Sequence, residues 1–150
     1  MSEETVLSDD FIRQLVSVGE VDLLVAIPSR NDCRTIGNVV RAAEESLLRN
    51  FRRQRTVLVN IDAHSRDGTP EAVRQASSVS ANGFETLRTL RWITTTIGPA
   101  AGESSVLRAI LAAADLLHAR ACAVISGSGV DVTPAWIDTL LTPVLRQNRD

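Results

Sequence analysis

The sequence predicts a Rossmann-like, doubly wound α/β fold, with a mostly parallel sheet of about four strands and flanking helices. Short apolar runs with the length and composition of strands buried on both faces alternate with longer segments whose apolar residues recur at helical spacing. This alternation is typical of parallel strands joined by right-handed helical crossovers. A length of 150 residues suits a single domain, residues 1–150.

The first half of the chain carries two of the expected strands. A short amphipathic helix leads in within residues 1–20, and an apolar strand follows that Pro28 is expected to stop. Asn31 or Asp32 is expected to cap the next helix, and Thr69-Pro70 is a typical helix start. The predicted elements are a helix over 7–18, a strand over 22–27, a helix over 36–51, a strand over 56–61 and a helix from 69 to about 77.

The second half repeats the alternation. Residues 77–83 and 98–105 have the small and polar composition of loops. Ser104 or Ser105 is expected to cap the helix that follows the second loop, and Pro143 is expected to kink or end the last helix. The predicted elements are a strand over 89–95, a helix over about 106–118, a strand over 121–125 and a helix that Thr133-Pro134 opens.

Composition narrows the function classes. The net charge is −2 and the pI is about 5.7, so the chain has no general electrostatic reason to bind nucleic acid or an anionic membrane. All 16 basic residues are arginines, which together with the many alanines indicates a GC-rich bacterial genome. The chain has no lysine, so any bound phosphate must be contacted by arginine, backbone N–H groups or a metal.

Cys33 and Cys122 match no metal or redox spacing. The sequence has no signal peptide or apolar run that could span a bilayer, so we expect a cytoplasmic protein.

Motifs narrow the classes further. The chain contains no G-x-G-x-x-G, no P-loop motif and no G-x-S-x-G elbow, so dinucleotide, P-loop and serine-hydrolase interpretations lack their signatures. Asp62 ends the second strand, at the edge where ligands bind in parallel sheets, and could accept from a nucleobase or a ribose hydroxyl. The alternative is that Asp62 and Asp67 are turn and cap residues. For Asp62 we favour the ligand role, and for Asp67 the structural one.

Three stretches resemble a known family. Ile27-Pro28-Ser29-Arg30-Asn31-Asp32, Val59-Asn60-Ile61-Asp62 and Ser65-x-Asp67-Gly68-Thr69 resemble the opening of family 2-type glycosyltransferases with the GT-A fold. The chain is most similar to the glucosyl- and mannosyl-3-phosphoglycerate synthase branch of that group. Leu107-Arg108 and Thr133-Pro134-x-Trp136-Ile137 extend the resemblance to about residues 21–145.

The resemblance implies a function. Residues 21–145 would form the half that binds a nucleoside diphosphate sugar, a UDP- or GDP-sugar, for glycosyl transfer (EC 2.4 class) to a small or lipid-linked acceptor. The acceptor half would be absent from this chain. By resemblance, Pro28, Ser29, Asn31 and Asp32 would line the nucleotide pocket, Asp62 would contact the base and Arg108 would reach a phosphate. Mg²⁺ or Mn²⁺ would assist, as it does in that family.

Two departures from the family pattern favour a second hypothesis. The metal-binding D-x-D falls at Ser126-Gly127-Ser128, with Asp131 as the nearest substitute, and Gly102-Glu103-Ser104 replaces a Gly-Lys-Gly. Serine hydroxyls bring no charge to a divalent cation, and a glutamate repels diphosphate. The alternative is therefore a truncated or degenerate, non-catalytic nucleotide-binding or interaction module. Either version is expected to form homo-oligomers, or to meet a chain that supplies the acceptor half, because a small sheet exposes an edge. An unrelated flavodoxin-like or regulatory α/β domain is the third class.

Overall fold

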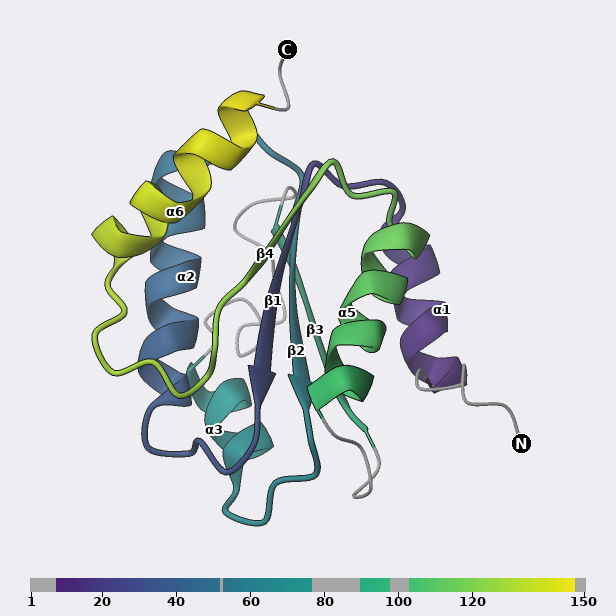
Figure 1. The fold of residues 1–150 in the computed structure, drawn as a ribbon, viewed down its shortest axis with the longest axis vertical. Coiled ribbons are helices and arrows are strands. Elements are labelled where there is room, and N and C mark those ends of the chain that lie inside the picture. Colours follow the sequence, from purple (N-terminus) through teal and green to yellow (C-terminus); the bar gives the residue numbers. More distant parts are fainter. Residues whose placement is uncertain (1–7, 52, 77–89, 98–102, 148–150) are drawn as a thin grey trace.

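A computed structural model describes residues 8–51, 53–76, 90–97 and 103–147, and it confirms the predicted α/β fold class. The described strands form one parallel sheet in the order β3-β2-β1-β4, with helices on both faces (Figure 1). The elements are α1 (Asp9–Val18), β1 (Leu23–Ser29), α2 (Ile36–Asn50), β2 (Thr56–Asp62), α3 (Thr69–Ala76), β3 (Leu90–Thr96), α5 (Glu103–Leu116), β4 (Ala121–Val124) and α6 (Pro134–Gln147). The loop predicted over 77–83 lies outside the described residues, as do residues 98–102 of the other predicted loop.

The strand order places a switch point between β1 and β4. The chain builds outward from β1 through β2 to β3, and then crosses back to add β4 on the other side of β1. Register aligns the strand ends, because Ser29 pairs with Asp62 and Asp62 pairs with Thr96. Ligands of open parallel sheets bind at the carboxyl ends of the strands beside such a switch point.

Two helical layers cover the sheet. Figure 1 shows α2, α3 and α6 on one face and α1 with α5 on the other. The side chains of β1 alternate between the two layers: Leu23, Val25 and Ile27 join the core under α2, while Leu24 and Ala26 join the core under α1 and α5. Burial on both faces explains why β1 is a continuous apolar run. No helix in the described part of the chain is both long and apolar enough to cross a bilayer.

Two prolines sit inside elements they were expected to end. β1 continues through Pro28 to Ser29, and the Pro28 carbonyl accepts the Gly127 N–H at 2.9 Å. A proline at the last positions of a strand costs little, because only its own N–H is lost to the ladder. Helix α6 likewise continues through Pro143, since one missing helical bond is outweighed by the burial of Ile137 and Leu141 in the core.

Helix starts also differ from the predictions. Ser104 and Ser105 lie inside α5, which begins at Glu103, so neither is its cap. The residue that precedes α2 is Thr35, and no side chain caps that helix. The Asp32 backbone carbonyl, rather than its carboxylate, accepts the N–H groups of Thr35 and Ile36 at 3.0 and 2.8 Å. The carboxylate of Asp32 is already used within its own turn, where it accepts the Arg30 N–H at 2.9 Å.

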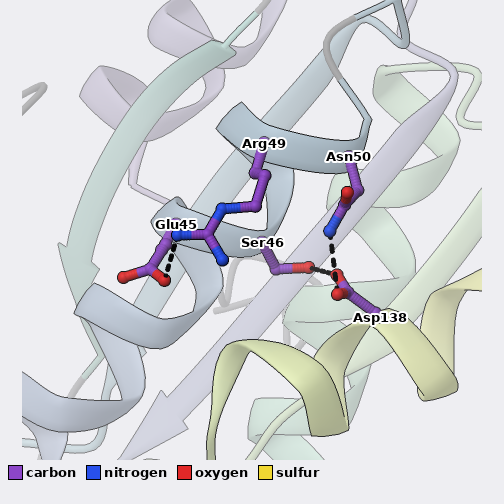
Figure 2. Close-up of polar contacts among 5 residues, drawn as sticks. All are labelled: Glu45, Ser46, Arg49, Asn50 and Asp138. Carbon is purple, nitrogen blue, oxygen red and sulfur yellow. Dashed lines mark hydrogen bonds and ion pairs between the residues drawn. The ribbon is translucent and has the colours of Figure 1, made fainter.

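Polar contacts fix α6 to α2. Figure 2 shows the Asp138 carboxylate of α6 between the Ser46 hydroxyl, which donates to Oδ1, and the Asn50 amide, which donates to Oδ2 at 2.8 Å. Arg49 and Glu45 form an ion pair at 2.8 Å along the exposed side of α2. The contacts of Asp138 hold α6, and hence the end of the loop that follows β4, in a fixed place beside α2.

Candidate functional site

A cleft opens at the switch point of the sheet. Its volume is about 830 Å³, and it lies at the carboxyl ends of β1 and β4, with the first two turns of α5 along one side. This size suits a small organic ligand. The lining residues are Pro28, Ser29, Arg30, Asp32, Ala63, Ser104, Val106, Leu107, Ile110, Val124, Ser126 and Ser128.

The cleft has one apolar side and one polar side. Val106, Leu107 and Ile110 of α5, together with Val124 of β4, provide the apolar side. The polar side carries the hydroxyls of Ser29, Ser104, Ser126 and Ser128, the guanidinium of Arg30 and the carboxylate of Asp32. A ligand with a flat or apolar part and an anionic or hydroxylated part would find a complement on each side.

A network of buried side chains lies directly beneath the polar side. Asp62 is fully buried, and its carboxylate accepts from the Ser29 hydroxyl at 2.8 Å, the Ser65 N–H at 2.8 Å and the Ser65 hydroxyl at 2.6 Å. Asn60, also fully buried, donates to the Ser29 hydroxyl at 3.1 Å and to the Ile27 carbonyl at 2.9 Å, and accepts from Thr94 at 3.0 Å. Ser29 links this strand-end network to the cleft.

The loops after β1 and β2 are joined by hydrogen bonds from side chains to the backbone. Ser65 accepts the Asn31 N–H at 2.8 Å, and Asn31 in turn accepts the Arg66 N–H at 2.8 Å. Asn31 and His64 both adopt positive φ, at 56° and 58°. Asparagine tolerates this region best among side chains with a Cβ. The two loops therefore form one braced unit at the edge of the cleft.

Asp67 continues this bracing. Its carboxylate accepts from both the N–H and the hydroxyl of Thr69, and from the Cys33 N–H at 3.1 Å. The hydrogen bond from the Thr69 hydroxyl is the main cause that lowers the pKa of Asp67 to about 2. The hydrogen bond to Asp67 is also the main cause of a raised pKa of the Cys33 thiol. Asp67 thus has the contacts of a turn and helix-capping residue.

The predicted nucleotide-pocket residues fall into different places. Pro28, Ser29 and Asp32 line the cleft. Asn31 lines a neighbouring hollow of about 410 Å³, which shares Asp32 and Ser128 with the cleft. Asp62 lies below the surface and lines neither space, and its contact with a base stays a prediction. Arg108 is exposed on α5, outside both hollows, and its contact with a phosphate also stays a prediction.

Sequence reasoning missed several of the lining residues. Arg30 lies within the stretch that carries the family resemblance but is not among the predicted site residues, although it is the cation of the cleft lining. Val124 ends β4, and Val106 and Ile110 lie in the first turns of α5. The signal that could have found them is the strand order, because the switch point brings the ends of β1 and β4 together. The order of the elements along the chain does not specify which strand neighbours β1.

The residues at the D-x-D position do not fit a divalent cation. The hydroxyls of Ser126 and Ser128 lie 2.7 Å apart and hydrogen-bond to each other, so their side chains converge but carry no charge. Asp131 is exposed and lines neither hollow. Among the residues that the structure describes, no group of three or more His, Cys, Asp and Glu could hold a metal ion. Mg²⁺ and Mn²⁺ prefer several hard, anionic oxygen ligands, which this pair does not offer.

No protein-family model matches the chain, and no curated protein matches it. The role of the cleft is therefore inferred from its own residues and from its place in the fold.

Proposed function

We propose that this chain is a glycosyltransferase-like domain that binds a nucleoside diphosphate sugar, a UDP- or GDP-sugar, in the cleft. The observation that supports this best is the position of the cleft, at the carboxyl ends of β1 and β4 beside the switch point of a parallel sheet. The stretch from Ile27 to Asp32, which carries the resemblance to family 2-type glycosyltransferases, supplies four of the lining residues.

The two sides of the cleft suit the two ends of such a ligand. Val106, Ile110 and Val124 offer apolar surface to the faces of a base. Arg30 offers charge-assisted hydrogen bonds to a diphosphate, and the hydroxyls of Ser126 and Ser128 suit sugar or phosphate oxygens. In a chain without lysine, an arginine at this place is the cation available to offset phosphate charge.

The uncharged pair at Ser126 and Ser128 favours a second version of this function. Transfer of a glycosyl group leaves a diphosphate whose charge must be offset, usually by a metal ion. The residues present do not fit that ion. In this version the chain is a nucleotide-binding or interaction module, and glycosyl transfer to an acceptor takes place only where a partner chain supplies the missing groups.

Calorimetric titration of UDP-glucose and GDP-mannose, with and without Mn²⁺, tests the proposal. We expect the wild-type chain to bind one of them with a micromolar Kd that Mn²⁺ does not change, since the cleft lacks metal ligands. Arg30→Ala should weaken binding by about tenfold, which corresponds to roughly 1.4 kcal/mol for a charge-assisted contact. The matched control is Arg13→Ala, which removes an exposed arginine from α1, a helix that contributes no residue to the cleft.

Two results would reject nucleotide-sugar binding at this site. One is a wild-type chain that binds neither nucleotide sugar at millimolar ligand. The other is an equal loss of affinity in Arg30→Ala and Arg13→Ala, which would indicate unspecific attraction of the ligand charge. Binding that requires Mn²⁺ would contradict the expectation of metal-independent binding and would support the metal-dependent mechanism of the glycosyltransferases that the sequence resembles.

Restoring the acids at positions 126 and 128 is a sharper test of the family alignment. Because the Ser126 and Ser128 hydroxyls already converge to 2.7 Å, carboxylates in the S126D/S128D variant would meet at one point. We expect this variant to bind Mn²⁺ and to gain Mn²⁺-dependent affinity for the nucleotide sugar. The matched control is V16D/S17D, which adds two carboxylates at exposed positions of α1, a helix that contributes no residue to the cleft. If S126D/S128D binds no more Mn²⁺ than this control, the alignment of the D-x-D is wrong.

A further inference from the structure

The edge strand β4 is covered on one face only. Ala121 and Ala123 are buried in the core under α2 and α6. Cys122 and Val124 alternate with them and so point toward the α1 and α5 layer, where both are exposed, Val124 by 49%. Strands of parallel sheets are normally buried on both faces. In the described part of the chain, the helical layer of α1 and α5 therefore does not cover this face of β4.

Helix α5 extends this bare surface. Leu107 and Leu111 lie one turn apart on the same side of the helix and are 52% and 60% exposed. Leu107 lines the same cleft as Val124, so the helix and the strand meet there. The four residues Leu107, Leu111, Cys122 and Val124 form what we call the α5–β4 surface. A contiguous exposed apolar surface of this kind marks an interaction site, unlike isolated apolar residues.

Two exposed residues of opposite charge lie on α5 beside this surface, and in a pair of antiparallel α5 helices each would face its opposite in the other copy. Arg108 and Asp115 are exposed on α5, seven residues apart and therefore on the same side of the helix. In the described part of the chain neither side chain forms an ion pair. The midpoint between them falls between Leu111 and Ala112. When two α5 helices pack antiparallel about that midpoint, Arg108 of each copy comes level with Asp115 of the other.

We propose that the α5–β4 surface binds a second copy of this chain about a twofold axis that passes near Leu111. An axis of this kind repeats each contact, so the interface contains the apolar surface of both copies and two opposite-charge pairs. The apolar side chains supply most of the binding free energy, and the two Arg108–Asp115 pairs set the antiparallel register. Leu107 and Val124 of this surface also line the cleft, so a second copy and a ligand in the cleft would compete for them, whereas Arg108, Leu111, Asp115 and Cys122 lie outside the cleft. The inference does not rest on the proposed nucleotide-sugar binding, because association of two copies is measured without any ligand.

Sedimentation velocity from low micromolar to near-millimolar protein tests the surface. The wild-type chain should pass from monomer to dimer within this range. Leu111→Asp, at a position already exposed, should weaken the dimer by at least about tenfold because it places two carboxylates near the axis. The matched control is Val16→Asp on α1, which is 63% exposed and lies outside the α5–β4 surface, and it should dimerise like wild type.

Charge reversal tests the register. R108D and D115R should each weaken the dimer by about tenfold, because each creates like-charge contacts on both sides of the axis. The double variant R108D/D115R restores opposite charges and should regain wild-type association. Circular dichroism and the melting temperature of each variant as a dilute monomer verify that it is folded.

Three outcomes would overturn the proposal. A wild-type chain that stays monomeric throughout the concentration range would reject the dimer. Equal association of Leu111→Asp and wild type would show that the dimer interface lies on another surface. A double reversal that stays as weak as the single variants would reject the antiparallel pairing of Arg108 with Asp115. Sedimentation is measured without nucleotide sugar and the titrations of the cleft are made at protein concentrations where the chain is monomeric, so the failure of one proposal can be told from the failure of the other.

Discussion

The loops after β1 and β2 and the loop after β4 border the same cleft, but they use acidic residues in opposite ways. In the first pair of loops, the carboxylates of Asp32, Asp62 and Asp67 all accept hydrogen bonds from the protein itself. In the loop after β4, Asp131 is exposed, and serines occupy the cleft positions. The carboxylate of an acid at the end of a parallel strand can therefore serve to hold the loops together.

Burial explains this use of Asp62. A carboxylate removed from water is costly unless its oxygens receive hydrogen bonds, and Asp62 receives them from Ser29 and Ser65. These bonds connect the end of β1 to the loop after β2, while Asn60 connects β1 to β3 through Thr94. The strand-end network therefore fixes the edge of the sheet on which the cleft is built.

The largest expected effect is on stability, and it compares the replacement of the buried, hydrogen-bonded Asp62 with that of the exposed Asp131. Asp62→Ala should lower the free energy of unfolding by about 2–4 kcal/mol, because it leaves the donors of Ser29 and Ser65 unpaired in a buried place. Asp131→Ala, the matched control in the loop after β4, should change it by no more than about 0.5 kcal/mol. Urea denaturation at neutral pH measures both.

Two results would contradict this contrast. If Asp62→Ala unfolds at the same urea concentration as wild type, the network does not stabilise the fold. If it is as stable as wild type but no longer binds a nucleotide sugar, Asp62 has the ligand role that its position in the sequence suggested.

Much of the fold could be predicted from the sequence. The continuous apolar runs identify β1 and β2, because strands buried on both faces admit few polar residues. Thr69-Pro70 marks the start of α3, and the local pattern Asp67-Gly68 identifies a turn. These features depend on neighbours a few residues apart, so a linear pattern contains them.

The arrangement of the site could not be predicted in the same way. The Asp62–Ser29 contact spans 33 residues, and it exists only because β1 and β2 pair in a register that brings their last residues together. The sequence does not distinguish a carboxylate that accepts a hydrogen bond from Ser29 from one that is free to bind a ligand. The meeting of Val124 with Leu107 depends on the position of β4 next to β1, which the chain order alone does not specify.

A smaller effect is expected from the glycines of the two regions, which are needed for different reasons. A Cβ at Gly127, after β4, would lie 2.4 Å from Ile36 Cδ1 and 3.1 Å from the Pro28 carbonyl oxygen. Gly127→Ala should therefore cost about 1–3 kcal/mol through overpacking. Gly68, after β2, has open space around it but a φ of +84°, so Gly68→Ala should cost only about 1 kcal/mol through backbone strain. Thermal denaturation ranks the two, and a larger loss for Gly68→Ala would contradict the close packing of Gly127 on α2.

The smallest effect concerns the pH dependence of the bracing at Asp67. Its pKa in the folded chain is about 2, below the ordinary value of 3.8, so the folded state favours the ionised carboxylate. The stability from this group is therefore fully present above about pH 5 and is lost as the pH falls toward 2. Asp67→Asn removes that dependence, so its melting temperature should lie below that of wild type at neutral pH and approach it in acid.

The cause of the lowered pKa can be tested in the same experiment. Thr69→Val removes the hydroxyl whose hydrogen bond contributes most to it, and should move the pKa of Asp67 back toward 3.8. Carbon-detected NMR titration of the Asp67 carboxyl group measures this directly. A carboxyl that titrates near 3.8 in the wild-type chain would show that the loops after β1 and β2 are not braced at this point, and the contrast with the loop after β4 would then rest on the buried Asp62 alone.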